Sequence, residues 1–538
     1  HHSLVPHFWK IDICSLAVLF FFQIELINFS LLHSPEVHTE LGRLRGQYVS
    51  VKGKETGVHA YLGVPFAKPP VGPALRLAAP QPVEGWEGVK DATQQPMLDL
   101  VEKLGAMLPV VPDISEDCLY LNIYTPADKA HDAKLPVMVW IHGGAFTMGS
   151  ASMYDGSALA AYQDVVVVLI QYRLGLLGFL STGDQHMPGN FGFLDQVQAL
   201  RWIQQHIHSF GGDPDLVTVF GESAGGRSVS LLLLSPLSDG LFHRAIAESG
   251  AAAVDLVANV SGCSTESTKT IADCMKNLDI DTIVSIGKKF KFSINVDGHF
   301  LIKPVNELLR QHELLTVPFI TGVNDHEGGW LLAHVSINIF YLFSLNPSFS
   351  DRCVKYFLKP KQAAIRDLMI DEYIGTGEDH VKNRNGFTEI LGDMIYTIPA
   401  IKTANAHRGG AVYLYEYQHP PTFQKEQRPS FVRTDHGDEI FTVLFHLSLI
   451  ILDPCPKEEE ELSKTMMSYW GNFARTGSPN GDGLAHWPQY GAGEDYLAIG
   501  LKQQVTRQHL KKNRFVFMTQ TLPEKIKQLK EKMERSEL

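Results

Sequence analysis

Short runs of apolar residues recur along the chain, and their lengths suit the strands of a β-sheet. They lie at 137–141, 165–170, 217–220, 245–247, 317–323, 411–417 and 514–518. Several are apolar at consecutive positions, without the polar alternation that a half-exposed strand shows. This pattern is typical of a sheet that helices cover on both faces, so we predict buried strands at these positions.

Helical patterns of apolar residues lie between these runs, for example at 194–206. Strands that alternate with helices favour a mostly parallel sheet, so the predicted fold class is α/β. In such sheets functional residues follow the carboxyl ends of the strands. The 538 residues exceed the usual length of one domain, but large α/β folds often extend this far as one unit. No repeat divides the sequence, and we expect a single domain at 34–538.

The N-terminal segment carries a separate apolar run at 13–22, ICSLAVLFFF. The run is too short for a transmembrane helix, which needs about 18 or more such residues, and it fits the core of a secretory signal peptide. The basic flank is weak, because Lys10 is followed by Asp12, and the chain begins without methionine. We interpret residues 1–33 as a signal peptide, with an altered N-terminus as the alternative.

The charge balance argues against one class of partner. The chain has 47 Lys and Arg against 59 Asp and Glu, a net charge of −12, and the sequence contains no basic patch. Nucleic-acid-binding domains present basic surfaces, so we expect no nucleic-acid partner. No CxxC pair or Cys/His cluster indicates a metal site, and we expect neither a metal nor an organic cofactor.

The sequence contains a glycosylation acceptor and a cysteine pair, whose modifications would form in the secretory pathway. Asn259 begins the triplet NVS, an acceptor for N-linked glycosylation. The six cysteines are too few for a disulfide scaffold at this length. Cys263 and Cys274 lie eleven positions apart in a polar stretch. Their spacing fits either a surface loop closed by a disulfide or two free thiols, and it does not decide between them.

The strongest chemical motif follows the predicted strand at 217–220. The chain continues as GESAGG at 221–226 and then as the apolar helix pattern SVSLLLLS. A G-x-S-x-G sequence between a strand and a helix is the nucleophile elbow, which lifts the serine hydroxyl clear of the sheet. Side chains at Gly221 and Gly225 would clash with neighbouring backbone in so tight a turn. Ser223 is therefore the candidate nucleophile.

A second glycine-rich loop follows the strand at 137–141, where the chain reads HGGAF at 142–146. Ester hydrolysis places negative charge on the carbonyl oxygen, and converging backbone N–H groups stabilise it. A loop of small residues beside the elbow can offer such donors. Gly144, Ala145 and Ala224 are the candidates.

A serine nucleophile also needs a base and an acid that orients the base. In hydrolases with this elbow they follow in the order serine, acid, histidine. The strand at 317–323 leads into NDHEGGW at 324–330, and DHGDE lies at 435–439. His436 is the candidate base. Spacing alone leaves Glu327 and Asp325 open as the acid.

Two long motifs carry a resemblance to a known family. Residues 210–225 read FGGDPDLVTVFGESAG and residues 116–126 read EDCLYLNIYTP. With these motifs the chain resembles the type-B carboxylesterases, the family of the cholinesterases and the neuroligin ectodomain. The likeness extends from about Gly42 to the C-terminus and is nearest to the broad-specificity carboxylesterases, close to the cocaine-esterase and fatty-acyl-CoA-hydrolase kinds.

The resemblance implies an α/β-hydrolase fold, small ester substrates and no cofactor, with a lid and acyl-pocket region at about 260–400. Amides and thioesters are alternative substrates, and the oligomeric state stays open. It favours Glu327 over Asp325 and retains the pair Cys263 and Cys274. The implied site consists of the triad and three oxyanion donors, namely Ser223, Glu327, His436, Gly144, Ala145 and Ala224. Many relatives have a third glycine where this chain has Ala145.

The chain also departs from the family. Relatives pair the Cys118 position with a cysteine about twenty residues earlier, but that stretch reads TQQPMLDL here, so we expect no such disulfide. Segments 340–358 and 444–456 align poorly, either as divergent substrate-site loops or as sequence errors. The cholinesterases carry a tryptophan where residues 107–114 have no aromatic side chain. The final RSEL resembles an endoplasmic-reticulum retention tail, although its serine departs from the usual pattern.

An alternative hypothesis is that the chain is a catalytically silent adhesion module like the neuroligins. Such modules typically lack the serine and carry a membrane stem, whereas Ser223 is present here and residues 524–535 form a charged helix pattern. A second rival, acyl-CoA thioester hydrolysis, uses the same machinery, and the sequence does not separate it from ester hydrolysis. We expect an ester hydrolase without a transmembrane anchor, in the endoplasmic reticulum lumen or secreted.

Overall fold

The structure of the chain is a computed structural model. The structure describes residues 34–94, 115–130, 132–252, 267–279, 294–330, 363–375, 379–407, 409–425, 428–444 and 456–536.

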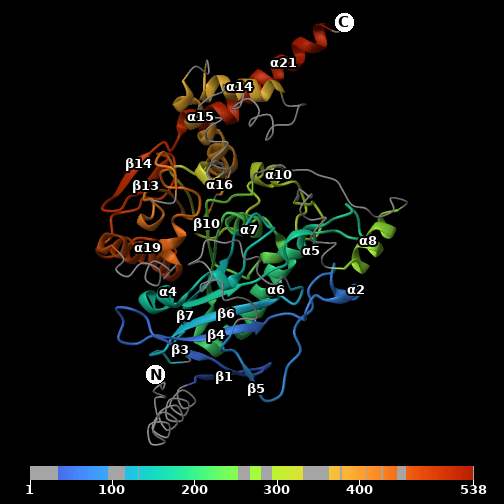
Figure 1. The fold of residues 1–538 in the computed structure, drawn as a ribbon, viewed down its shortest axis with the longest axis vertical. Coiled ribbons are helices and arrows are strands. Elements are labelled where there is room, and N and C mark those ends of the chain that lie inside the picture. The colour runs from blue at the N-terminus through green and yellow to red at the C-terminus, as the bar shows by residue number, and fades with distance from the viewer. Residues whose placement is uncertain are drawn as a thin grey trace, which may run out of the picture.

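A single large sheet organises the described residues (Figure 1). Its strand order is β14-β13-β12-β11-β10-β9-β7-β8-β6-β4-β3. The strands are β3 (Gln47–Val49), β4 (Val58–Pro65), β6 (Tyr120–Pro126), β7 (Leu135–Ile141), β8 (Val166–Ile170), β9 (Gly212–Glu222), β10 (Arg244–Glu248), β11 (Phe319–Asn324), β12 (Val412–Tyr417), β13 (Asp495–Ile499) and β14 (Gln504–Gln508). All pairings from β8 to β13 are parallel, and the antiparallel pairings lie towards the two edges. The predicted α/β class with a mostly parallel sheet is confirmed.

A small separate sheet consists of β1 (Glu36–Thr39), β2 (Gly42–Arg45) and β5 (Val89–Asp91). The helices are α2 (Gly72–Leu75), α4 (Ser157–Gln163), α5 (Gly175–Phe179), α6 (Phe191–His206), α7 (Ala224–Leu232), α8 (Thr268–Asn277), α10 (Val305–Arg310), α14 (Ala363–Tyr373), α15 (His380–Gly392), α16 (Ile398–Ala406), α17 (Ile440–Val443), α19 (Lys457–Thr476), α20 (Lys512–Val516) and α21 (Leu522–Ser536). No helix within the described ranges combines the length and apolar character that crossing a bilayer requires.

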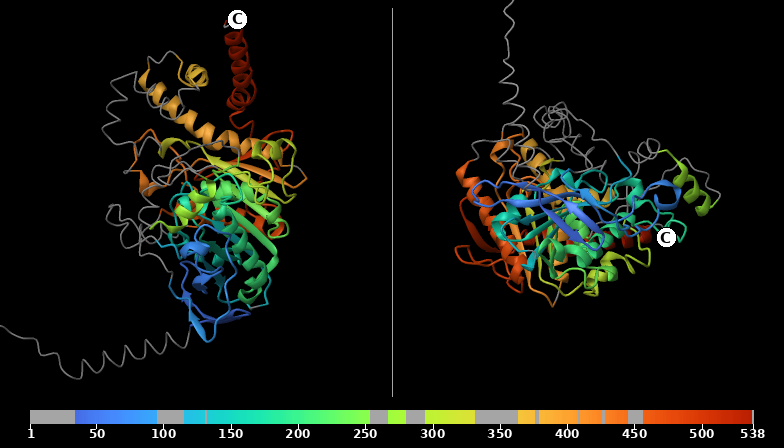
Figure 2. Two further views of the ribbon diagram at one scale, coloured as in Figure 1. Left: turned by 90° about the vertical axis from the view of Figure 1, so that its right-hand side faces the viewer. Right: turned by 90° about the horizontal axis from the view of Figure 1, so that it is seen from below.

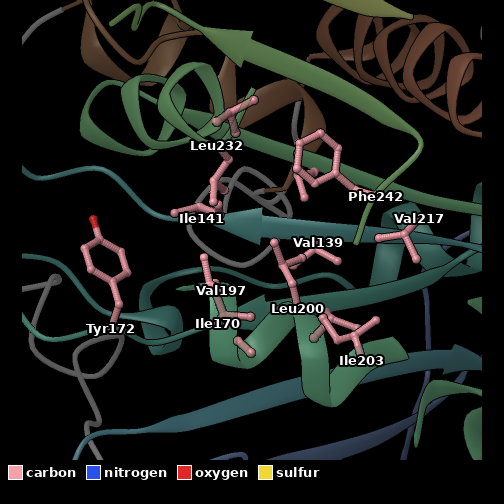
Figure 3. Close-up of a cluster of buried hydrophobic side chains, with 14 of the residues drawn as sticks. Val139, Ile141, Ile170, Tyr172, Val197, Leu200, Ile203, Val217, Leu232 and Phe242 are labelled. Atoms are coloured by element: carbon pink, nitrogen blue, oxygen red, sulfur yellow. The ribbon is translucent and has the colours of Figure 1, made fainter. Parts of the chain in front are cut away.

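Helices bury both faces of the sheet, and β7 shows how its sequence serves both. Val139 and Ile141 belong to one apolar cluster, which includes Val197 and Leu200 of α6 (Figure 3). Trp140 lies in the opposite cluster with residues of α4 and α19. Successive side chains of a strand point to opposite faces, so a run without polar residues serves a sheet covered on both sides. The predicted strands at 137–141, 165–170, 217–220, 245–247, 317–323 and 411–417 are confirmed on this basis.

The predicted strand at 514–518 is wrong. These residues lie in α20 and in the π-helical turn η7 (Phe517–Thr521), which lead into α21. The helical spacing lets Phe517 and Leu522 pack with Met369 and Tyr373 of α14 in one buried cluster. A short apolar run fits a strand or a buried helix equally well, and the packing against α14 decides for the helix. Figure 2 shows α21 extending away from the sheet.

Candidate active site

Ser223 stands alone between the end of β9 and the start of α7, as the elbow motif predicts. Its backbone has φ 57° and ψ −117°, a conformation that residues other than glycine seldom adopt. Two hydrogen bonds hold the turn, from Ser223 N to Glu248 O at 2.9 Å and from Arg227 N to Ser223 O at 2.9 Å. The strained turn is therefore fixed by its neighbours, which is typical of functional positions.

The glycines of the elbow are required by close backbone contacts. A Cβ atom on Gly221 would lie 2.4 Å from the carbonyl oxygen of Ile141, and one on Gly225 would lie 1.8 Å from the same atom. Both distances are far below van der Waals contact. The predicted clash is confirmed, and it shows that the elbow packs directly on the end of β7.

His436 lies between the other two predicted triad residues. Its Nε2 atom is 2.8 Å from Ser223 Oγ, and its Nδ1 atom is 2.8 Å from Glu327 Oε2. Glu327 follows the carboxyl end of β11, and His436 follows β12 along the chain. The fold therefore brings the three side chains into one hydrogen-bonded line. Such a line allows a base to take the serine proton while an acid orients that base.

The two acids that spacing left open have different partners in the structure. Glu327 contacts the imidazole, whereas Asp325 pairs with Arg433 at 3.4 Å and accepts a hydrogen bond from Thr434 N at 3.3 Å. The two carboxylates follow the same strand but serve different partners. The geometry thus agrees with the choice of Glu327 that the family resemblance favoured.

Two residues with no role predicted from the sequence, Ser249 and Asn324, hold Glu327, and a third, Glu439, contacts both of them. Glu327 Oε1 accepts hydrogen bonds from Ser249 Oγ at 2.5 Å and from Asn324 N at 2.6 Å. Ser249 Oγ also lies 3.1 Å from Glu439 Oε1, and Asn324 Nδ2 donates to Glu439 Oε2 at 2.5 Å. Asn324 and Glu439 lie inside the two loops that supplied the candidates, but nothing in the sequence indicated a role for Ser249.

The hydroxyl proton of Ser249 can serve only one of its two acidic neighbours. Burial, reinforced by repulsion from Glu222 and Glu327, raises the pKa of Glu439 well above its usual value. A neutral Glu439 can donate its own proton to Ser249 Oγ, which leaves the serine hydroxyl free to donate to Glu327. In this arrangement Glu327 Oε1 accepts the Ser249 hydrogen bond while Oε2 faces the histidine.

Glu222, the residue before the nucleophile, adds a second negative charge beside the histidine. Its Oε1 atom lies 3.1 Å from His436 Nε2. Burial raises the pKa of Glu222 to about 7, against the attraction of His436. Burial disfavours the charged imidazole, but Glu222 and Glu327 outweigh it and raise the pKa of His436 to about 9. The site therefore favours the imidazolium form.

The HGGA loop lies against the nucleophile. A Cβ atom on Gly143 would lie 3.1 Å from Ser223 Cβ, so the loop and the elbow are in contact. Gly144 has φ 107° and Ala145 has φ 55°, the left-handed region in which glycine costs least. Ala224 is the first residue of α7, and the first N–H groups of a helix have no acceptor within it. The three predicted donors therefore come from segments that meet at Ser223.

Two aromatic rings flank the imidazole. The Tyr396 ring centroid lies 4.2 Å from that of His436, and the Trp330 ring stacks on the His436 imidazole with centroids 5.7 Å apart. Tyr396 belongs to the π-helical turn η5 (Asp393–Thr397) between α15 and α16. Such turns recur at functional sites, and this one seats the tyrosine against the histidine.

Several predictions concern residues outside the described ranges. The residues concerned are Asn259, Cys263, 1–33, 107–114, 340–358 and, in the second poorly aligning segment, 445–455. Cys274 on α8 is disulfide-bonded, and Cys118 is a free thiol. Over the parts of the chain that are described, no group of His, Cys, Asp and Glu side chains is arranged to hold a metal ion.

Comparison with known proteins places the chain among ester hydrolases. The model of the carboxylesterase family matches residues 33–518. The chain is 44% identical to a cocaine esterase of Oryctolagus cuniculus, over 92% of this chain and 98% of that protein. It is 46% identical to an acylcarnitine hydrolase of Mus musculus, over 92% and 93%. It is 44% identical to a medium-chain fatty acyl-CoA hydrolase precursor of Anas platyrhynchos, over 90% and 92%.

Proposed function

Because this chain belongs to the carboxylesterase family and is a carboxylic ester hydrolase, we propose that it cleaves its substrates through an acyl-enzyme formed on Ser223. The observation that carries the proposal is the pair of 2.8 Å contacts that His436 makes with Ser223 and Glu327. Only a base within hydrogen-bond reach of the hydroxyl can take its proton during attack.

In the first half of the reaction, Ser223 Oγ attacks the ester carbonyl carbon while His436 Nε2 accepts the hydroxyl proton. The carbonyl oxygen becomes an oxyanion, and the N–H groups of Gly144, Ala145 and Ala224 donate hydrogen bonds to it. The intermediate collapses, the carbon–oxygen bond to the alcohol breaks, and His436 gives its proton to the departing alkoxide. The alcohol leaves, and the acyl group stays on Ser223.

In the second half, water replaces the serine. His436 accepts a proton from the water as its oxygen attacks the acyl carbon, and the new intermediate expels Ser223 Oγ, which recovers the proton. The carboxylic acid leaves and ionises. Glu327 holds Nδ1–H throughout and stabilises the imidazolium that forms in each half, a role that its own hydrogen bonds from Ser249 and Asn324 support.

The acyl-enzyme can be trapped directly. We expect acid-quenched turnover of p-nitrophenyl butanoate to leave protein heavier by one butanoyl group, which peptide mapping assigns to Ser223. Ser230 lies on the same helix and accepts a hydrogen bond from Ala252 N, so Ser230→Ala is the matched control and should trap the same adduct. A butanoyl group mapped to another residue during full turnover would overturn the proposal.

Thioester hydrolysis is a second candidate activity, because one relative is named a fatty acyl-CoA hydrolase. The same attack on a thioester carbonyl would expel a thiolate. A panel of esters that differ in acyl and alcohol size, with the matching acyl-CoA thioesters, separates the two activities by kcat/KM. Higher kcat/KM for every ester than for the thioester of the same acyl group would assign the chain to ester hydrolysis.

We also propose that the chain is a single domain that enters the secretory pathway and resides in the endoplasmic reticulum lumen or is secreted. The continuous sheet from β3 to β14 supports one domain. The disulfide at Cys274 supports an oxidising compartment, where such bonds persist. A glycosidase-sensitive mass shift that is lost in Asn259→Gln would support entry through this route, and its absence from secretory-cell material would contradict it.

A further inference from the structure

Arg227 places a guanidinium next to the nucleophile. It lies on α7, four residues after Ser223, and its backbone N–H donates to Ser223 O. Its Nε–H donates to the carbonyl oxygen of Ala251 at 3.3 Å, just beyond the carboxyl end of β10. The side chain is therefore anchored at the edge of the sheet where Ser223 stands.

This guanidinium has no acidic partner among the residues that the structure describes. Its two Nη groups make no hydrogen bond there, and no described carboxylate lies within ion-pair distance. Two other enclosed arginines are paired with a carboxylate: Arg173 donates through Nε and Nη2 to Asp195, and Arg428 donates through both Nη groups to Asp438. Arg227 differs from these two arginines because no described residue accepts a hydrogen bond from its Nη groups.

Arg227 is partly buried. Burial lowers the pKa of its guanidinium, and Tyr396 opposes that shift. The side chain still retains accessible surface. Tyr396 is the residue whose ring lies 4.2 Å from that of His436, so Arg227 is one side chain away from the proposed base.

Arg227 does not serve as a counterion for the nearby glutamates. The pKa values of Glu222 and Glu439 respond to burial, to His436, to Asn324 and to other glutamates. The pKa of Arg227 responds to burial and Tyr396. Arg227 keeps accessible surface, and its Nη groups are not among the buried atoms of the described residues that lack a partner. These donors are therefore open to an anionic group that enters from solvent.

We propose that Arg227 binds a carboxylate group carried by the ester substrate, so that the site selects esters with one anionic end. The inference rests on the proposed role of Ser223. A planar guanidinium whose two Nη groups bond to no described residue matches the two oxygens of a carboxylate. The carboxylate can belong to the acyl part or to the alcohol part of the ester, and two arms of one experiment distinguish these sources.

Each arm compares an anionic ester with a neutral one of the same shape. The acyl arm uses ethyl hydrogen succinate against ethyl 4-oxopentanoate, in which a methyl ketone replaces the carboxylate. The alcohol arm uses the butanoate esters of 3-hydroxypropanoate and of 4-hydroxybutan-2-one. The readout is the anionic-to-neutral ratio of kcat/KM within each variant, so a general loss of turnover cancels.

We expect Arg227→Met to lower this ratio in one arm by about tenfold to a hundredfold, the range for a charge-assisted hydrogen bond. Arg227→Lys should give a ratio between those of wild type and Arg227→Met, because lysine keeps the positive charge but lacks the two parallel Nη donors. If the methionine variant does not fold, the lysine variant provides the test. Arg244 is the matched control. It lies at the opposite end of β10, and its Nε and Nη1 also have no partner in the part of the chain that is described. Its Met variant should leave both ratios unchanged.

Binding to the same variants in a Ser223→Ala background gives a readout that does not depend on turnover. Equal ratios for Arg227→Met and wild type, in both arms and in binding, would overturn the inference while hydrolysis of the neutral esters left the proposed function standing. If wild-type protein hydrolysed none of the four esters, the proposed function would fail, and the binding ratios alone would decide the role of Arg227.

Discussion

Replacing Glu222 by Gln should move the acid limb of the pH–rate profile to lower pH. The carboxylate lies 3.1 Å from His436 Nε2, and together with Glu327 it raises the pKa of His436 to about 9 against the opposing effect of burial. The imidazole acts as a base only when neutral. In wild-type protein, kcat/KM should therefore fall as the pH drops through a value above 6.5, the ordinary pKa of histidine.

The size of the shift follows from the charge that is removed. Two unit charges about 3 Å apart interact by about 5 kcal/mol at an effective dielectric constant near 20. Burial raises the pKa of Glu222 to about 7, so this carboxylate is only partly ionised where the limb falls, and the full interaction is not expressed. A neighbouring carboxylate typically shifts a pKa by about 1 to 3 units, and we expect a downward shift of at least about one unit.

The assay is kcat/KM for one neutral ester between about pH 5 and pH 9.5 for wild type, Glu222→Gln and Glu248→Gln. Glu248 is the control, because it is buried on β10, accepts a hydrogen bond from Trp470 Nε1 and has a pKa raised to about 8 by burial. Its Gln variant should move the limb much less. An unmoved or upward-shifted limb in Glu222→Gln would refute the electrostatic reasoning.

Two further predictions concern the acid and the substrate. Glu327→Gln should lower kcat by about a thousandfold to ten-thousandfold with the fold intact, because the imidazole loses its orienting charge, whereas Asp325→Asn should cost less than about tenfold. Steady-state kinetics and a melting curve check both variants, and a reversal of the two effects would show that the wrong acid was chosen. Butyrylcholine should be cleaved with lower kcat/KM than its uncharged carbon isostere, 3,3-dimethylbutyl butanoate. A cation–π site contributes about 2 kcal/mol, or about thirtyfold, and residues 107–114 supply no aromatic ring for it. A clear preference for the cation would contradict this reading.

The sequence predicts the centre of the sheet better than its edge. The runs at 137–141 and 217–220 were identifiable because both faces of β7 and β9 are buried, which removes polar alternation. β14 reads QVTRQ and is mostly exposed, so its residues carried no apolar signal. The run at 514–518 carried such a signal but packs against α14 as a helix, because tertiary contacts override a short pattern.

The candidate site divides in the same way. Ser223 was predictable because the elbow imposes small residues at fixed spacing around it. Asp325 and Glu327 follow the same strand, and their separation in the fold depends on Arg433 and His436, more than a hundred residues away. The approach of Glu222 to His436 is also set only in three dimensions, since the local motif does not specify where the histidine loop lies.

The role of Ser223 can be tested by labelling with a fluorophosphonate probe together with turnover. Wild type and Ser230→Ala should both be labelled, with the probe mapped to Ser223, and should hydrolyse p-nitrophenyl butanoate. Ser223→Ala should show no labelling, and its kcat should fall by about 10⁴-fold to 10⁶-fold. Labelling of Ser223→Ala at another serine, with turnover intact, would contradict the account.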